Sequence, residues 1–155
     1  MFETVVWATD GSPAADRALP FAKQLLAPGG QLVAVHVREL LVGRAGGQPV
    51  YADADEIEAR IREQVEELRR EGLNVTLKLH TTFDVNAAHS IAKEATAARA
   101  ELIVVATRGR GPLASAVLGS VTQTLLHDAT FPVLAVPPHV GEPAVDEALA
   151  EAGVS

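Results

Sequence analysis

The chain has 155 residues, the length of a single domain that can bury its own core without disulfides or structural metals. It contains no cysteine, which excludes disulfides and thiolate metal sites and suits a reducing compartment. Its net charge of −7 argues against general binding to nucleic acid, because that needs a basic face that displaces counterions from phosphates.

The apolar segments are all short. None approaches the roughly 18 consecutive apolar residues of a membrane-spanning helix, and the first residues lack the basic start and apolar centre of a signal peptide. We therefore expect a cytoplasmic protein that has no membrane partner.

The first part of the chain predicts a strand, a helix and a second strand. Residues 4–9 form a short apolar run that ends in an Asp-Gly-Ser-Pro turn. A Ser-Pro pair typically starts a helix, because the hydroxyl caps free amides and proline loses no hydrogen bond at the first helical position. We predict that Pro20 kinks this helix or shifts its start, that Pro28-Gly29-Gly30 ends it, and that a strand follows over residues 31–37.

The middle of the chain predicts a loop, a helix, a strand and another helix. Residues 38–52 are rich in glycine and long enough to act as a lid. The helix expected over 53–71 carries three acid-before-base pairs four residues apart: Glu56/Arg60, Glu58/Arg62 and Glu66/Arg70. Residues 75–82 alternate in polarity, which favours a strand near a sheet edge, and Asp84 or Asn86 then caps the next helix.

A glycine-rich stretch follows the fourth strand and predicts a binding site. The apolar run 102–106 is typical of a strand buried on both faces, and the glycines and proline after it force the chain to turn. A helix is then predicted to begin at Gly119 and Ser120, with free amides that attract an anion such as phosphate. The other members of this anion site lie in the loop: Gly109, Arg108 and Arg110.

Strands and helices alternate to a last strand over Pro132 to Val136. This order predicts an α/β fold, an open five-stranded parallel sheet that is doubly wound and Rossmann-like, with helices on both faces. In such sheets ligands bind at the carboxyl ends of the strands, where the strand order reverses. If the first and fourth strands are neighbours, Asp10 and the glycine loop converge there. We expect one domain over residues 1–138 and an acidic tail over 139–155 that includes a short helix.

The combined motifs resemble the universal stress protein family, and the resemblance extends to about Pro137. The nucleotide signature of that family is glycine, two residues, glycine, nine residues, glycine, then serine or threonine; here Gly109 and Gly119-Ser120 match it. Asp10, His36-Val37 and residues 131–136 are also similar to the family. One position departs from the pattern, because Ala106 stands where the first glycine is expected.

The resemblance implies a function, a ligand and an assembly. It implies an adenine nucleotide α-hydrolase-like fold, ATP as ligand with Mg or Mn as counter-cation, and a stress regulator that hydrolyses ATP slowly at most. It also implies a homodimer in which Pro132 to Val136 pairs antiparallel with its copy. The residues implied at the nucleotide are Ala8, Thr9, Asp10, Val37, Val105, Ala106, Gly109, Gly119, Ser120 and Val121.

Three of these positions also have a plainer interpretation. Asp10 would accept ribose hydroxyls or meet a phosphate-bound cation, or it serves only as a turn carboxylate. Val37 and Val105 would flank the base, or they are ordinary core residues. Ala106 has two interpretations: a position that requires a positive φ angle strains alanine, whereas a position that needs glycine only to admit the ribose can still accommodate a methyl group.

Catalytic residues are not predicted. The histidines are scattered without the spacing of metal ligands, and Ser115 lacks an evident His/Asp pair. Gly109, Gly111 and Ala114 match a dinucleotide pattern weakly, and the helix begins too far from them for that fingerprint. Three alternatives remain: a dimeric module that binds no nucleotide, a nucleotide-dependent enzyme such as an ATPase or nucleotidyl transferase, and a regulator whose ligand is a cyclic nucleotide.

Overall fold

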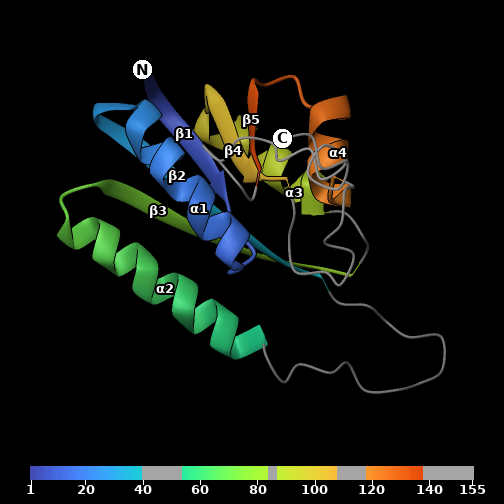
Figure 1. Cartoon of the computed structure of the whole chain (residues 1–155), viewed down its shortest axis with the longest axis horizontal. Helices are drawn as coiled ribbons and strands as arrows, with labels where there is room; N and C mark the ends of the chain where they lie inside the picture. The colour runs from blue at the N-terminus through green and yellow to red at the C-terminus, as the bar shows by residue number, and fades with distance from the viewer. Residues whose placement is uncertain (40–53, 84–86, 108–117, 138–155) are drawn as a thin grey trace, which may run out of the picture.

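The computed structural model describes residues 1–39, 54–83, 87–107 and 118–137. Most of the predicted lid, both predicted caps of the third helix, the loop that holds Gly109, and the predicted tail lie outside the described residues. In the described part the chain alternates between strands and helices from end to end (Figure 1). The elements are β1 (Phe2–Ala8), α1 (Pro13–Leu25), β2 (Leu26–Glu39), α2 (Ala54–Arg70), β3 (Asn74–Thr82), α3 (Ala87–Ala98), β4 (Leu102–Ala106), α4 (Ser120–Asp128) and β5 (Val133–Val136).

The strands form one parallel sheet in the order β3-β2-β1-β4-β5. β1 pairs with β2 on one side and with β4 on the other, in a register that places Val5 opposite Leu102. The order therefore reverses next to β1, as in doubly wound sheets. This confirms the predicted fold class, the edge position of β3 and the neighbourhood of the first and fourth strands.

Two apolar cores lie on opposite faces of the sheet, because successive side chains of a strand point to opposite sides. Val5 and Trp7 pack with α1 and α2, whereas Val6 and Ala8 pack with α3 and α4. Figure 1 shows α1 in front of β1 and β2, with α2 running beside β3 and with α3 and α4 near β4 and β5. No helix in the described ranges is long and apolar enough to cross a membrane.

The predicted boundary between the first helix and the second strand was wrong. Helix α1 runs through Pro20 and ends at Leu25, and β2 begins at Leu26 rather than at Gln31. The pairing with β1 is irregular here, since Phe2 lies opposite Leu26 but Thr4 lies opposite Gln31. Pro28-Gly29-Gly30 thus occupies an irregular start of the strand, where Gly29 has a φ of +77°.

Strand β2 extends into the first residues of the segment predicted as a lid. Strand β2 continues through Arg38 to Glu39 and pairs along β3, where Arg38 lies opposite Thr81. The Arg38 guanidinium binds the carboxylates of Asp55 and Glu58, at 3.0 Å and 2.9 Å, which joins the end of β2 to the first turns of α2. These ion pairs give a reason for the extra strand residues.

The three charge pairs predicted along α2 have different outcomes. Arg62 binds Glu58 at 2.9 Å, as predicted. Glu66 pairs with Arg69 instead of Arg70, one residue closer along the helix. The Arg60 side chain forms its ion pair outside its own helix, with Asp16 of α1.

Candidate functional site

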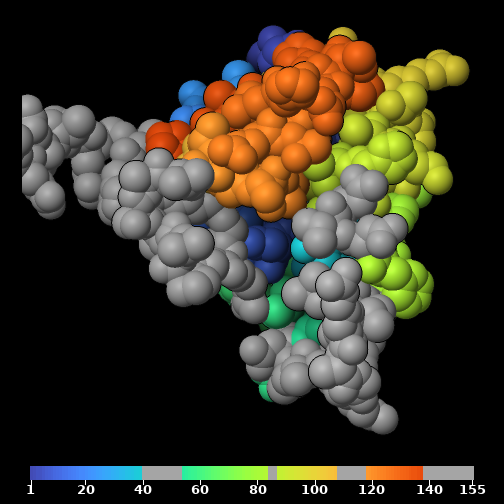
Figure 2. Space-filling model, turned by 90° about the vertical axis from the view of Figure 1, so that its right-hand side faces the viewer, coloured from blue at the N-terminus to red at the C-terminus, as the bar shows by residue number. Residues whose placement is uncertain are grey.

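The candidate site lies at the carboxyl ends of β1, β2 and β4, where the strand order reverses. On the face shown in Figure 2, the dark blue N-terminal part of the chain is visible between α4 (orange) above it and green atoms from the beginning of α2 below it. The cyan end of β2 lies beside it. The predicted convergence of the first and fourth strand ends is therefore present in the structure.

The turn between β1 and α1 is fixed by its own hydrogen bonds. The Ser12 amide donates to Asp10 Oδ1 at 2.9 Å, and the Gly11 amide donates to Thr9 Oγ1 at 3.1 Å. Ser12 Oγ in turn accepts from the Ala15 amide at 3.2 Å and caps α1, as the Ser-Pro pair predicted. Asp10 thus serves as a turn carboxylate. A carboxylate has about four lone-pair positions, so this role is compatible with accepting ligand hydroxyls as well.

Thr9 lies inside the protein rather than at a surface. Its side chain is 5% exposed, its amide donates to Val35 O at 2.9 Å, and its carbonyl lies 2.9 Å from His36 Nδ1. Because a carbonyl can only accept, the hydrogen-bond network assigns the proton to Nδ1 of this buried histidine. Thr9 and His36 therefore hold the ends of β1 and β2 together, a connection that the sequence motifs did not reveal.

The beginning of α4 is tied to the end of β4. The Gly119 amide donates to Thr107 O at 2.8 Å, and Thr122 Oγ1 donates to Ala106 O at 2.8 Å. The Thr107 amide donates to Val136 O at 2.9 Å, which continues the pairing with β5. These bonds place the residues on either side of the glycine-rich loop next to each other.

The first turn of α4 is suited to an anion. Its N-cap residue is Gly119, which has no side chain that could accept from the amides behind it. The Gly119 amide is already bonded to Thr107, so the donors that the helix geometry leaves are the next amides, beginning with Ser120 and Val121. The helix dipole adds partial positive charge at the same place.

The alanine at position 106 is not strained. Arg99, with a φ of 53°, is the only non-glycine residue of the described ranges that has a positive φ angle. Ala106 instead ends β4 in extended backbone, where alanine is tolerated as well as glycine. The departure from the signature therefore carries no backbone cost here.

The apolar members of the predicted site share one face of the sheet. Ala8 and Val105 are each 6% exposed and belong to the core beneath α3 and α4, and Val37 packs against that core. Val105 is thus a core residue, which agrees with the plainer of its two interpretations. Of the predicted site residues, the structure brings these three together with Thr9, Asp10, Ala106 and residues 119–121, and Gly109 lies outside the described part.

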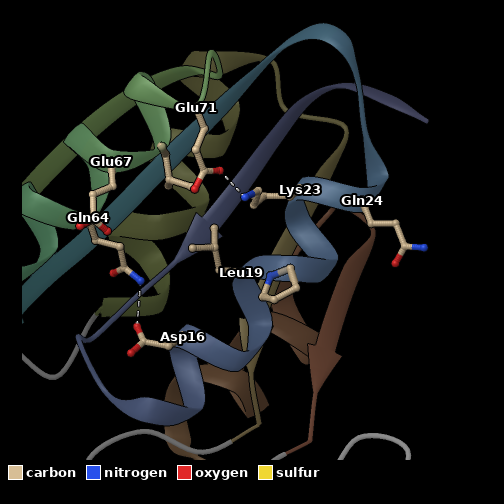
Figure 3. A pocket seen from close by; sticks show the side chains of 9 residues that line it. Asp16, Leu19, Lys23, Gln24, Gln64, Glu67 and Glu71 are labelled. Atoms are coloured by element: carbon tan, nitrogen blue, oxygen red, sulfur yellow. Dashed lines mark hydrogen bonds and ion pairs between the residues drawn. The ribbon is translucent and has the colours of Figure 1, made fainter.

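A groove of about 510 Å³ lies between α1 and α2, on the other face of the sheet from α4 (Figure 3). Its polar side chains bind each other, since Lys23 pairs with Glu71 at 2.5 Å and Gln64 Nε2 donates to Asp16 Oδ1 at 3.1 Å. These bonds tie α1 to α2.

The described residues contain no group of three or more His, Asp or Glu side chains that could hold a metal ion. His127 lies in the last turn of α4, at the end opposite the proposed anion. Its hydrogen bond with Asp128, and then the charge of that carboxylate, raise the pKa of His127 above its ordinary value. This histidine therefore lies away from the amides at the start of α4.

The sheet order, with its reversal next to β1, and the helices on both faces define a doubly wound α/β protein. The universal stress protein family model matches residues 1–137. A universal stress protein from Thermus aquaticus, described as lying in the QAH/OAS sulfhydrylase 3' region, is 34% identical over 140 residues, covering 88% of this chain and 99% of the relative. The chain therefore belongs to the universal stress protein family.

Two solved structures of similar fold hold adenine nucleotides. One is a universal stress protein in complex with cAMP, with a TM-score of 0.63 and 24% identity, covering 88% of this chain and 97% of that one. The other is a universal stress protein family protein from Arabidopsis thaliana with AMP bound, with a TM-score of 0.60 and 16% identity, covering 94% of this chain and 98% of that one. At these identities the likeness concerns the fold.

Proposed function

We propose that this protein is an ATP-binding regulator of the cytoplasmic stress response that hydrolyses ATP slowly at most. The observation that carries the proposal is the start of α4, a helix whose N-cap is a glycine and whose first amides lie beside the carboxyl end of β4. Negative phosphate groups are stabilised at such a helix start. The cAMP and AMP complexes of proteins with the same fold support an adenine nucleotide as the ligand.

Each part of the nucleotide has a matching group in the crevice. The amides of Ser120 and Val121 and the Ser120 hydroxyl would bind phosphate oxygens, together with the glycine loop. The Asp10 carboxylate, oriented by its bond to the Ser12 amide, would accept ribose hydroxyls or approach a phosphate-bound cation. Ala8 and Val37 would form the apolar side of the adenine pocket. Mg or Mn would be held mainly by the phosphates themselves.

Calorimetric titration with ATP and Mg tests this proposal. We expect saturable binding to the unchanged protein, and Asp10→Ala should weaken it by roughly tenfold or more because hydrogen bonds to a charged group are lost. Gly119→Val should also weaken it. Glu66→Ala, which removes an exposed carboxylate on α2, is the matched control and should bind normally. Circular dichroism establishes that each variant is folded.

Three results would contradict the proposal in different ways. No saturable heat at millimolar ATP would favour a dimeric module that binds no nucleotide. Unchanged affinity in both Asp10→Ala and Gly119→Val would place the ligand elsewhere. ATP turnover faster than roughly one per second would indicate an enzyme rather than a regulator. Competition with cAMP and AMP decides which adenine nucleotide binds most tightly.

We further propose that the protein is a homodimer in which β5 pairs antiparallel with its copy. β5 is an edge strand, and its first three residues, Val133, Leu134 and Ala135, are only partly buried. An apolar edge strand favours pairing with another chain, and two-fold symmetry closes such an assembly. Light scattering on the purified protein should give the mass of two chains, and the mass of one chain at micromolar concentration would contradict this assembly.

A further inference from the structure

Helix α2 binds the turn that carries Asp10, although it lies outside the predicted site. One guanidinium nitrogen of Arg60 donates to the Gly11 carbonyl, and the other donates to the Asp16 carboxylate in the first turn of α1. The second oxygen of Asp16 accepts from Gln64 at 3.1 Å. One side chain of α2 therefore joins the backbone of the turn to the helix that follows it.

The same turn also packs closely against α2. Gly11 is buried and adopts a φ of +73°, and a Cβ atom at this position would lie 2.8 Å from Ile57 Cγ2 and 3.6 Å from Ile61 Cδ1. The backbone of Gly11 is thus enclosed between Arg60 on its carbonyl and two isoleucines beside its α-carbon. Asp10 and Ser12, on either side, are joined by the hydrogen bond that orients the carboxylate.

We infer that Arg60 is a positioning residue for the nucleotide site, and that α2 sets the orientation of the Asp10 carboxylate through the Gly11 carbonyl. This inference rests on the proposed function, with the Asp10 carboxylate accepting the ribose hydroxyls. A guanidinium suits the role because its planar fork reaches two acceptors at fixed angles, which a lysine ammonium does not. The Arg60 side chain is half exposed, so its effect on the turn comes from the direction of its hydrogen bonds more than from burial of the side chain.

Binding of ATP and of 2',3'-dideoxy-ATP to three variants tests this role. Arg60→Ala should weaken the binding of ATP by roughly tenfold, because it loses the two charge-assisted hydrogen bonds that join the turn and the start of α1 to α2. The same substitution should weaken the binding of the dideoxy nucleotide less, because that nucleotide lacks the hydroxyls from which Asp10 would accept hydrogen bonds. Arg60→Lys should recover part of the affinity. Arg62→Ala removes the same charge from the same helix, where Arg62 binds Glu58 one turn away, and should leave both affinities near those of the unchanged protein.

Amide hydrogen exchange without nucleotide provides a readout that does not depend on the proposed function. In Arg60→Ala the Ser12 amide should exchange several-fold faster than in Arg62→Ala, because the turn is less restrained. If the unchanged protein binds no ATP, the proposed function fails, and the exchange rates still decide whether Arg60 holds the turn. If Arg60→Ala shows the exchange rate of Arg62→Ala, or weakens ATP and dideoxy-ATP equally, the positioning role is overturned.

Discussion

Replacing Gly11 with alanine is expected to lower the free energy of unfolding by about 2 to 4 kcal/mol. Two costs combine at this position. An L-residue at the observed φ of +73° costs about 1 kcal/mol or slightly more, and the new methyl would overlap Ile57 Cγ2, at 2.8 Å. Forcing apart a packed contact of this kind typically costs about 1 to 3 kcal/mol. Urea denaturation followed by circular dichroism measures the loss.

Gly29→Ala is the matched control for this substitution. Gly29 has nearly the same φ, +77°, but nothing lies within 4 Å of the position where its Cβ would be. It should therefore show the backbone cost alone, about 1 kcal/mol. Adding Ile57→Ala to Gly11→Ala should recover part of the loss in the double mutant, since it removes the atom that is too close. Equal losses of stability for Gly11→Ala and Gly29→Ala would mean that the close contact between α2 and the turn adds no cost.

Thr122→Val is expected to destabilise the protein by about 1 to 3 kcal/mol, because the buried Ala106 carbonyl would lose its donor. Thr122 is 2% exposed and its hydroxyl donates at 2.8 Å, so water cannot easily replace it. The bond also joins α4 to β4 beside the glycine loop, and its loss should weaken ATP binding by loosening the start of the helix. Denaturation and calorimetric titration measure the two effects separately.

Thr124→Val offers a control in the same helix. The Thr124 hydroxyl donates to the Ser120 carbonyl at 2.9 Å, but this bond is exposed to solvent. Its replacement should change stability by less than about 0.5 kcal/mol. Thr122→Ser, which keeps the hydroxyl, should retain most of the stability lost in Thr122→Val. Similar losses for Thr122→Val and Thr124→Val would show that the bond to Ala106 has no special role.

The fold could be predicted from the sequence because its strands are apolar runs and its helices have one apolar face. The alternation of these elements predicted the parallel, doubly wound class. It did not predict that β4 lies beside β1, which the structure shows. The start of β2 could not be predicted, because Pro28-Gly29-Gly30 resembles a helix end. Only the pairing of Phe2 with Leu26 makes these residues part of the sheet.

The parts of the candidate site that depend on residues close together in sequence could be predicted. Ser12, Gly119 and the Asp10 turn are recognisable because caps and turns depend on neighbouring residues. The helical spacing rule assigned Arg60 to Glu56, whereas in the structure Arg60 binds the Gly11 carbonyl and Asp16, which are 49 and 44 positions away in sequence. Thr122 likewise depends on a partner in another element. Interactions between distant segments leave no spacing pattern by which they could be found.

The separation of the two cores by the sheet has a consequence for how this protein can change over evolutionary time. The turn with Asp10 is held by α2 from one side, and the start of α4 is joined to β4 over the other core. Substitutions inside one core should have little epistatic effect on the other core, because the sheet separates the two sets of side chains and distant residues without shared partners act independently. The packing of one helix layer could thus diverge while the layer on the opposite face of the sheet stays as it is.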